Sequence, residues 1–127
     1  MENLENAIVE IKEKMPGLKL LENEPMSSHC SFRIGGPARR MAFPESREQL
    51  VILLGLAEEC GIRPFLLGRG TNLLVSDRGL DTLVIKTAER MTSIRRLDDV
   101  TLEADVGVLL SRLAVYAQQA GLAGLEF

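Results

Sequence analysis

The sequence predicts a mixed domain of the α+β or α/β class, in which helices cover a sheet. Apolar residues recur at helical spacing in three segments, at residues 4–15, 46–61 and 109–121. Short apolar runs typical of strands lie between these segments, at residues 40–43, 64–67, 82–86 and 100–104. The chain contains no internal repeat and no low-complexity segment. These observations together favour one globular domain of layered helices and strands.

The first segment predicts an amphipathic helix. Its apolar residues recur at helical spacing, with Glu and Lys between them; they are Leu4, Ala7, Ile8, Ile11 and Met15. Pro16 and Gly17 end this helix. We expect residues 1–17 to pack as a helix over a domain that comprises residues 18–127. The stretch after it, Asn23–Ser31, is polar and is interpreted as irregular, and its lone His29 as a surface residue.

A short strand, Arg40–Phe43, is closed by Pro44 and leads into the second helix. Ser46 is expected to cap this helix, and Gln49 to reach back toward it, as in a capping box. Gly61 is placed to end the helix in a left-handed conformation. The apolar stripe expected to be buried consists of Leu50, Leu53, Leu54 and Ala57.

The second half of the chain predicts further strands and a last helix. The strand-like runs are Pro64–Leu67, Leu73–Val75, Thr82–Lys86 and Val100–Ala104. The last helix ends near Gly121 and has an apolar face made of Leu109, Leu110, Leu113, Ala114 and Ala117. This order completes the layout of helix, strand, helix, several strands and helix.

Composition excludes several classes of function. The 127 residues are 46% hydrophobic and 26% charged, with a net charge of −3, so neither a nucleic-acid nor an anionic-membrane partner is indicated. No apolar run reaches the roughly 20 residues that span a bilayer, and the first residues lack a signal-peptide pattern. Cys30 and Cys60 form no CxxC pair, so we expect reduced thiols, no metal site and a cytoplasmic location.

The sharpest local feature is the sequence Gly68-Arg69-Gly70-Thr71-Asn72, directly after an apolar strand. Two glycines let the backbone turn tightly and present successive N–H groups to one point, which suits an anion such as a diphosphate. A plain tight turn explains the same residues equally well. The loop is neither a Walker loop nor a Rossmann fingerprint, because the Lys-Ser/Thr ending is absent and strand residues follow instead of a helix.

Two weaker candidates have structural explanations of equal weight. Gly35-Gly36-Pro37 forms a rigid bend, and the nearby Arg33 is either a phosphate contact or a solvated side chain. Gly107, next to Val108, would let the backbone approach a flat ligand closely, or else marks a bulge or turn.

Five blocks, in this order, resemble the UDP-N-acetylenolpyruvoylglucosamine reductase family. They are Ser-Phe-Arg-Ile-Gly-Gly-Pro-Ala at 31–38, Pro-Phe-Leu-Leu-Gly-Arg-Gly-Thr-Asn-Leu-Leu-Val-Ser-Asp at 64–77, Gly79 with Leu83-Val84-Ile85, Ala104-x-Val106-Gly107-Val108, and Gly121-Leu122-x-Gly124-Leu125-Glu126-Phe127. The resemblance covers about residues 28–127, and the spacing of its blocks is far more specific than any single pair of glycines.

The resemblance implies an α+β fold, the N-terminal part of a vanillyl-alcohol-oxidase/PCMH-type FAD-binding fold. It implies noncovalent FAD, since Asn72 and Leu73 stand where related oxidases often carry a flavin-linking histidine. It also implies a reaction in which NADPH, through the flavin, reduces the UDP-sugar UDP-N-acetylglucosamine enolpyruvate to UDP-N-acetylmuramate for peptidoglycan. The implied cofactor-binding residues are Gly68, Arg69, Gly70, Thr71, Asn72, Leu73, Gly107 and Val108.

The sequence departs from the family after Phe127, where a second glycine-rich flavin segment, the substrate domain and the catalytic side chains would follow. No residue of 1–127 is assigned a catalytic role, so we expect the chain alone to lack reductase activity and to bind FAD weakly or not at all. We expect truncation at Phe127 to expose Leu122, Leu125 and Phe127 and to permit self-association. A nucleotide-binding module without catalysis, and a part of another oxidase-type flavoenzyme, remain alternatives.

Overall fold

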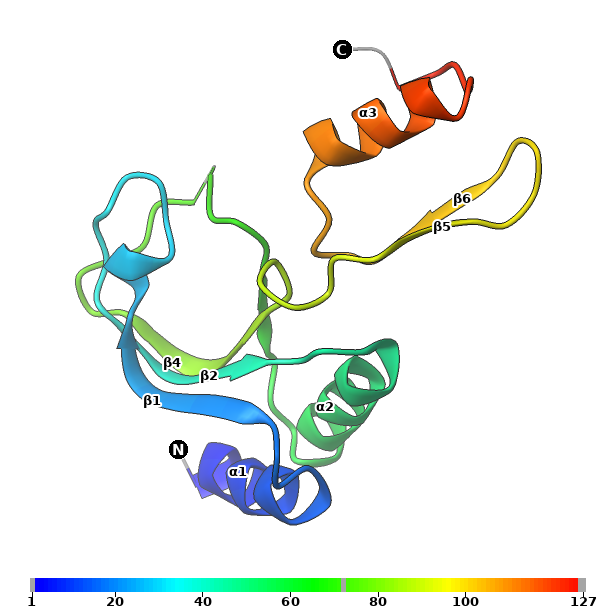
Figure 1. Ribbon diagram of the computed structural model, residues 1–127. Coiled ribbons are helices and arrows are strands. Elements are labelled where there is room, and N and C mark those ends of the chain that lie inside the picture. The colour runs from blue at the N-terminus through cyan, green and yellow to red at the C-terminus, as the bar shows by residue number, and fades with distance from the viewer. Residues whose placement is uncertain (1, 72, 126–127) are drawn as a thin grey trace.

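The computed structural model describes residues 2–71 and 73–125 of the chain. Its elements in chain order are α1 (Glu2–Lys14), β1 (Lys19–Pro25), the 3-10 turn η1 (Met26–Ser28), β2 (Pro37–Phe43), α2 (Arg47–Glu59), β3 (Phe65–Leu67), β4 (Leu80–Lys86), β5 (Ile94–Arg96), β6 (Leu102–Ala104) and α3 (Leu110–Gln119). Figure 1 shows two regions, which we call the body (residues 2–92) and the arm (residues 93–125).

The body is built on a mixed four-stranded sheet with the strand order β1-β2-β4-β3. β1 and β2 pair antiparallel, whereas β4 runs parallel to both of its neighbours. At the end of the β3–β4 pair, Leu67 lies opposite Lys86. This register places the loop that follows β3 beside the last residue of β4.

Helices α1 and α2 cover one face of the sheet (Figure 1). Leu4, Ile8 and Ile11 of α1 are buried against the sheet, which confirms the amphipathic interpretation of the first segment. The buried cluster on this face comprises Leu4, Ile8, Ile11, Met15, Leu18, Ala42, Leu53, Leu56, Leu83 and Ile85. Side chains alternate along a strand, so Leu83 and Ile85 of β4 both point toward the helices.

Irregular segments, not helices, cover the opposite face of the sheet. The buried cluster on this face comprises Met26, Cys30, Ala38, Met41, Phe43, Leu67, Val75 and Val84. Met26, Cys30 and Val75 come from the loops that precede β2 and β4. By the same alternation, Lys86 follows Val84 onto this loop-covered face. The polar side chains discussed below all lie on this face or at its rim.

The predicted ends of α2 are confirmed. Ser46 Oγ accepts a hydrogen bond from the Gln49 amide at 3.2 Å, while Gln49 Oε1 accepts one from the Glu45 amide at 2.8 Å. Gly61 has φ +70°, and the two bonds of a Schellman motif close the helix, from the Gly61 and Ile62 amides. Gly121 ends α3 in the same way.

The arm extends away from the body and consists of the β5–β6 hairpin followed by α3 (Figure 1). Among the described residues, two hydrogen bonds connect it to the loop after β4: the Gly107 amide donates to the Met91 carbonyl at 2.9 Å, and the Arg112 guanidinium donates to the Thr92 carbonyl at 2.5 Å. On the hairpin, hydrogen bonds from Arg95 to Glu103 and Asp105 raise the pKa of Arg95. The arm is therefore held mainly by local contacts.

Several sequence expectations differ from the structure. Leu73–Val75 is not a strand; it is irregular and buries only Val75. Leu56 takes the buried place expected for Leu54, which is exposed on the outer side of α2. Residues 23–25 were expected to be irregular but belong to strand β1. This strand pairs with β2, although it carries residues that strands disfavour.

Candidate functional site

The glycine-rich loop lies against the segment that precedes β2. Gly70 has φ +73°, and its carbonyl accepts a hydrogen bond from the Ser31 amide at 3.0 Å. A Cβ built on Gly70 would lie 2.1 Å from the His29 carbonyl oxygen, so only glycine fits without a shift of the backbone. Asn72, a predicted cofactor-binding residue, lies outside the described residues.

The backbone amides of this loop bear on the predicted anion site. Within the described part of the chain, the N–H groups of Gly68, Arg69, Gly70 and Thr71 donate to no backbone carbonyl. They are not committed to the sheet, which ends one residue earlier at Leu67. Unpaired donors on a tight turn fit the diphosphate-binding interpretation of the sequence. The assignment of Gly68–Leu73 to a cofactor stays a prediction.

A polar cleft of about 620 Å³ opens beside the loop. Its lining combines three cationic side chains with three serines, and the full set is Ser27, Ser28, His29, Cys30, Ser31, Arg33, Arg69 and Lys86. Arg69 and Lys86 also line an adjoining cleft of about 330 Å³. Arg33, for which a phosphate contact and a solvated side chain were both open, thus shares a cleft with Arg69 of the glycine loop.

A chain of partly buried polar contacts leads into this cleft. Lys86 Nζ lies 2.8 Å from His29 Nδ1 and 3.3 Å from Glu89 Oε1. His29 Nε2 lies 3.1 Å from Glu24 Oε2. The side chains of His29 and Lys86 are only 8% and 11% exposed. His29 is therefore not the surface residue that the sequence interpretation made it.

The segment at residues 31–37 connects the same loops. The Gly36 amide donates to the Ser76 carbonyl at 2.9 Å, and the Gly36 carbonyl accepts from the Met26 amide at 3.0 Å. Gly36 thereby joins η1 to the chain that follows the glycine loop. The bend expected at Gly35–Pro37 thus serves to hold two loops of the site together.

Gly107 packs against Thr87, which is hydrogen-bonded to Leu67, the residue before the glycine loop. The Thr87 amide donates to the Leu67 carbonyl at 3.0 Å, and a Cβ on Gly107 would lie 2.0 Å from the Thr87 carbonyl oxygen. The Val108 amide donates to the Asp105 carbonyl at 3.1 Å, which closes a turn. The turn expected as one explanation of Gly107 is thus present. A cofactor contact for Gly107 or Val108 stays a prediction.

The sequence interpretation gave no role to His29 or Lys86. Lys86 had a usable signal, because it directly follows the apolar run Leu83–Ile85 in a strand in which every second residue faces the loop side of the sheet. His29 had no such signal, because its partners are Glu24 and Lys86. Lys86 is 57 positions away in the sequence, and Glu24 lies in the segment that was expected to be irregular.

The described residues contain neither a metal-binding cluster nor a membrane-spanning helix. They contain no group of three or more His, Cys, Asp or Glu side chains that could hold a metal ion. Both cysteines are free thiols, and buried Cys30 donates to the Met26 carbonyl at 2.8 Å. None of the described helices is long and apolar enough to cross a bilayer.

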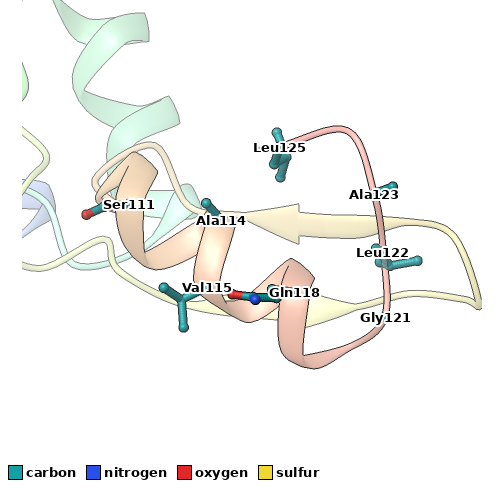
Figure 2. A pocket seen from close by; sticks show the side chains of 8 residues that line it. All are labelled: Ser111, Ala114, Val115, Gln118, Gly121, Leu122, Ala123 and Leu125. Carbon is teal, nitrogen blue, oxygen red and sulfur yellow. The ribbon is translucent and has the colours of Figure 1, made fainter. Parts of the chain in front are cut away.

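A second, more apolar groove lies along the arm, between α3 and the chain that follows it (Figure 2). It measures about 600 Å³ and is lined by Ser111, Ala114, Val115, Gln118, Gly121, Leu122, Ala123 and Leu125. Leu122 and Leu125 belong to the edge expected to be exposed, and both are partly buried; Phe127 lies outside the described residues. Self-association through this edge stays a prediction, which sedimentation of the purified chain would check.

The sequence matches the family model described as "FAD binding domain" over residues 38–127. This match contains the glycine loop, Lys86 and Gly107, but not His29 or Arg33.

Curated relatives share the name UDP-N-acetylenolpyruvoylglucosamine reductase. The protein from Heliobacterium modesticaldum is 46% identical over 107 residues, which are 84% of this chain and 34% of the relative. The protein from Moorella thermoacetica is 44% identical over 117 residues, which are 91% of this chain and 38% of the relative. The chain thus spans little more than a third of the length of these relatives.

Two solved structures of enzymes share the fold. The 4-ethylphenol oxidase from Gulosibacter chungangensis matches with a TM-score of 0.65 at 17% identity, over 94% of this chain and 25% of the oxidase. An alkyldihydroxyacetonephosphate synthase matches with a TM-score of 0.65 at 20% identity, over 92% of this chain and 25% of the synthase. The α+β fold class predicted from the sequence is confirmed.

Proposed function

Since this chain belongs to the FAD-binding domain family, we propose that it holds FAD noncovalently, as the flavin-binding portion of a UDP-N-acetylenolpyruvoylglucosamine reductase. The observation that carries the proposal is the set of unpaired amides at Gly68–Thr71, next to a cationic cleft. Such donors are the usual partners of a diphosphate, which FAD carries between its flavin and adenosine parts.

Each residue of the loop has a distinct role in this proposal. Gly68 and Gly70 allow the turn, Thr71 adds a hydroxyl donor, and Arg69 places a guanidinium at the cleft. Bound FAD would supply hydride-transfer chemistry, while the protein positions the cofactor and excludes water. Asn72 and Leu73 offer no histidine for a covalent link, so the cofactor is proposed to be exchangeable.

The proposed reaction uses NADPH to reduce the UDP-sugar enolpyruvate, which yields UDP-N-acetylmuramate for peptidoglycan synthesis in the cytoplasm. The identity of 40–46% to relatives named as this reductase supports this choice over another oxidase-type flavoenzyme. The two matched enzyme structures, at 17% and 20% identity, support the fold alone. No residue of this chain is proposed as the proton donor, so the chain alone is expected to show no turnover.

A glycine-to-alanine substitution in the loop tests the proposal without disturbing the fold. A Cβ on Gly68 meets no atom within 4 Å, and its backbone lies outside the left-handed region, so Gly68→Ala should fold normally. The added methyl group would keep a diphosphate away from the loop amides. We expect Gly68→Ala to weaken FAD binding at least about tenfold, since charge-assisted hydrogen bonds are lost. Flavin fluorescence during titration measures this.

The matched control is Gly55→Ala, on the exposed side of α2, where a Cβ also meets nothing within 4 Å. This variant should bind FAD like the parent chain. Riboflavin, which lacks the diphosphate, should bind far more weakly than FAD to the parent chain and to Gly55→Ala, and this difference should be smaller in Gly68→Ala. Equal FAD affinity in Gly68→Ala and Gly55→Ala would contradict the proposal.

A further inference from the structure

The polar cleft is lined by positive charge, although the chain as a whole is net negative. The chain has a net charge of −3, yet the described residues that line the cleft include Arg33, Arg69 and Lys86 and no carboxylate. Ser27, Ser28 and Ser31 add hydroxyl groups. A concentration of cations and hydroxyls in a hollow favours an anion with several oxygen acceptors.

Lys86 is the most deeply placed of these cations. A buried ammonium is costly unless it has partners, and Lys86 has two acceptors, His29 Nδ1 and Glu89 Oε1. An ammonium has three N–H donors. Within the described part of the chain, the third donor has no acceptor in any hydrogen bond, and Lys86 lines both clefts. One donor of Lys86 is thus left for a ligand.

The contact with Lys86 determines which nitrogen of His29 carries hydrogen. An ammonium only donates, so His29 Nδ1 must be the acceptor and the hydrogen of the neutral ring must be on Nε2. Nε2–H then donates to Glu24 Oε2, at 3.1 Å. His29 therefore holds the ammonium of Lys86 in place and connects it to a carboxylate without competing for the cleft.

Arg33 and Arg69 complete the arrangement from two different loops. Neither side chain forms an ion pair or a hydrogen bond with another described residue, unlike Arg40, which pairs with Glu5 at 2.9 Å. Guanidinium groups match the geometry of phosphate oxygens and bind them through two donors at once. Two unpaired guanidinium groups beside a buried ammonium suit a doubly charged oxyanion.

We propose that this cleft is a binding site for an oxyanion of the phosphate class. Lys86 is its buried cationic residue, Arg33 and Arg69 are its outer cations, and His29 is the positioning residue that orients Lys86. The identification of that anion with the diphosphate of FAD rests on the proposed function. The preference of the cleft for a phosphate-class anion does not depend on the proposed function.

Inorganic pyrophosphate tests the cleft in the full 127-residue chain. Titration calorimetry should detect pyrophosphate binding that Lys86→Gln weakens about tenfold or more, since a charge-assisted contact is removed. Arg69→Gln, on an exposed side chain, should weaken binding severalfold and leave thermal unfolding unchanged, which covers the case in which Lys86→Gln fails to fold. Lys12→Gln, on the exposed side of α1, removes the same charge away from the cleft and should bind like the parent.

Two further arms identify the source of the anion. Displacement of pyrophosphate by FAD, but not by riboflavin, assigns the cleft to the flavin nucleotide. Simultaneous binding of FAD and pyrophosphate assigns it to a separate phosphate compound. If pyrophosphate binds and the weak FAD binding expected of this chain is the same in Gly68→Ala as in the parent, the flavin proposal fails and the cleft proposal stands. Unchanged pyrophosphate affinity in both Lys86→Gln and Arg69→Gln would overturn the cleft proposal.

The positioning role of His29 has its own signature. Nitrogen NMR of the His29 ring should show hydrogen on Nε2 in the neutral form. His29→Gln, whose side-chain oxygen can accept from Lys86, should retain more pyrophosphate affinity than His29→Leu, which offers no acceptor. A neutral ring with hydrogen on Nδ1 would overturn this role, because Lys86 could not then donate to it.

Discussion

The body and the arm both contain strands and an amphipathic helix but bury their apolar residues very differently. The sheet of the body is covered on both faces, by helices on one and by loops on the other. Among the described arm residues, only Gly107 and Ala117 are buried. Large apolar side chains exposed on the arm are Leu97, Val100, Val106, Leu109, Leu110 and Val115. Hydrophobic periodicity thus predicts that α3 forms a helix. It does not predict whether other parts of the described chain bury the apolar face of that helix.

The largest expected effect comes from paired leucine truncations. Leu53 in α2 is 0% exposed, whereas Leu110 in α3 is 58% exposed. Leu53→Ala should lower the free energy of unfolding by about 3 kcal/mol, because it leaves a cavity in the core. Leu110→Ala should change it by less than about 0.5 kcal/mol. Urea unfolding followed by circular dichroism measures both, and equal losses would show that the arm is packed as tightly as the body.

A pair of left-handed glycines gives the next effect. Gly70 in the body has φ +73° and Gly121 in the arm has φ +75°. Gly121→Ala meets no atom within 4 Å and should cost about 1 kcal/mol, the price of the left-handed backbone alone. Gly70→Ala adds a clash with the His29 carbonyl and should cost about 2 kcal/mol or more. Thermal unfolding of the two variants tests this order, and a reversed order would refute the tight packing of the two loops.

The smallest effect is confined to the hairpin of the arm. The backbone N–H of Val100 donates to Asp98 Oδ1 at 2.9 Å, which lowers the pKa of Asp98 below its ordinary value of 3.8. The charged carboxylate therefore supports the turn at any pH above 3.8, and this support is lost as the pH falls through the lowered pKa. The Val100 amide proton signal should shift in that range. Asp98→Asn should abolish the shift and leave the body unchanged.

Much of the fold was predictable from the sequence because its signals are local. The capping of α2 by Ser46 and its termination at Gly61 depend on residues within a few positions of each other, and the structure confirms both. Strand β1 was not predicted, because most of its residues are poor strand formers. It is a strand because β2 offers it an antiparallel partner, and Arg40 pairs with Glu22 across the two strands at 3.5 Å.

The candidate site was only partly predictable for a related reason. The glycine loop could be found without a structure, because two closely spaced glycines after an apolar run predict a tight turn at Gly68–Thr71. The contact between His29 and Lys86 joins residues 57 positions apart, and no pattern in one sequence reports it. The sequence marked Arg33 only as a charged residue near a bend. That Arg33 and Arg69 line the same cleft follows from the packing of two loops, which the sequence does not show.

The position of β4 has a consequence for how the protein is made. β4 lies between β2 and β3, although it follows both of them in the chain. A nascent chain that has emerged only as far as Leu67 therefore lacks the strand that joins β2 to β3. The sheet closes only after Leu80–Lys86 leaves the ribosome, and the same step brings Lys86 to His29. Synthesis thus couples completion of the sheet to assembly of the cationic cleft.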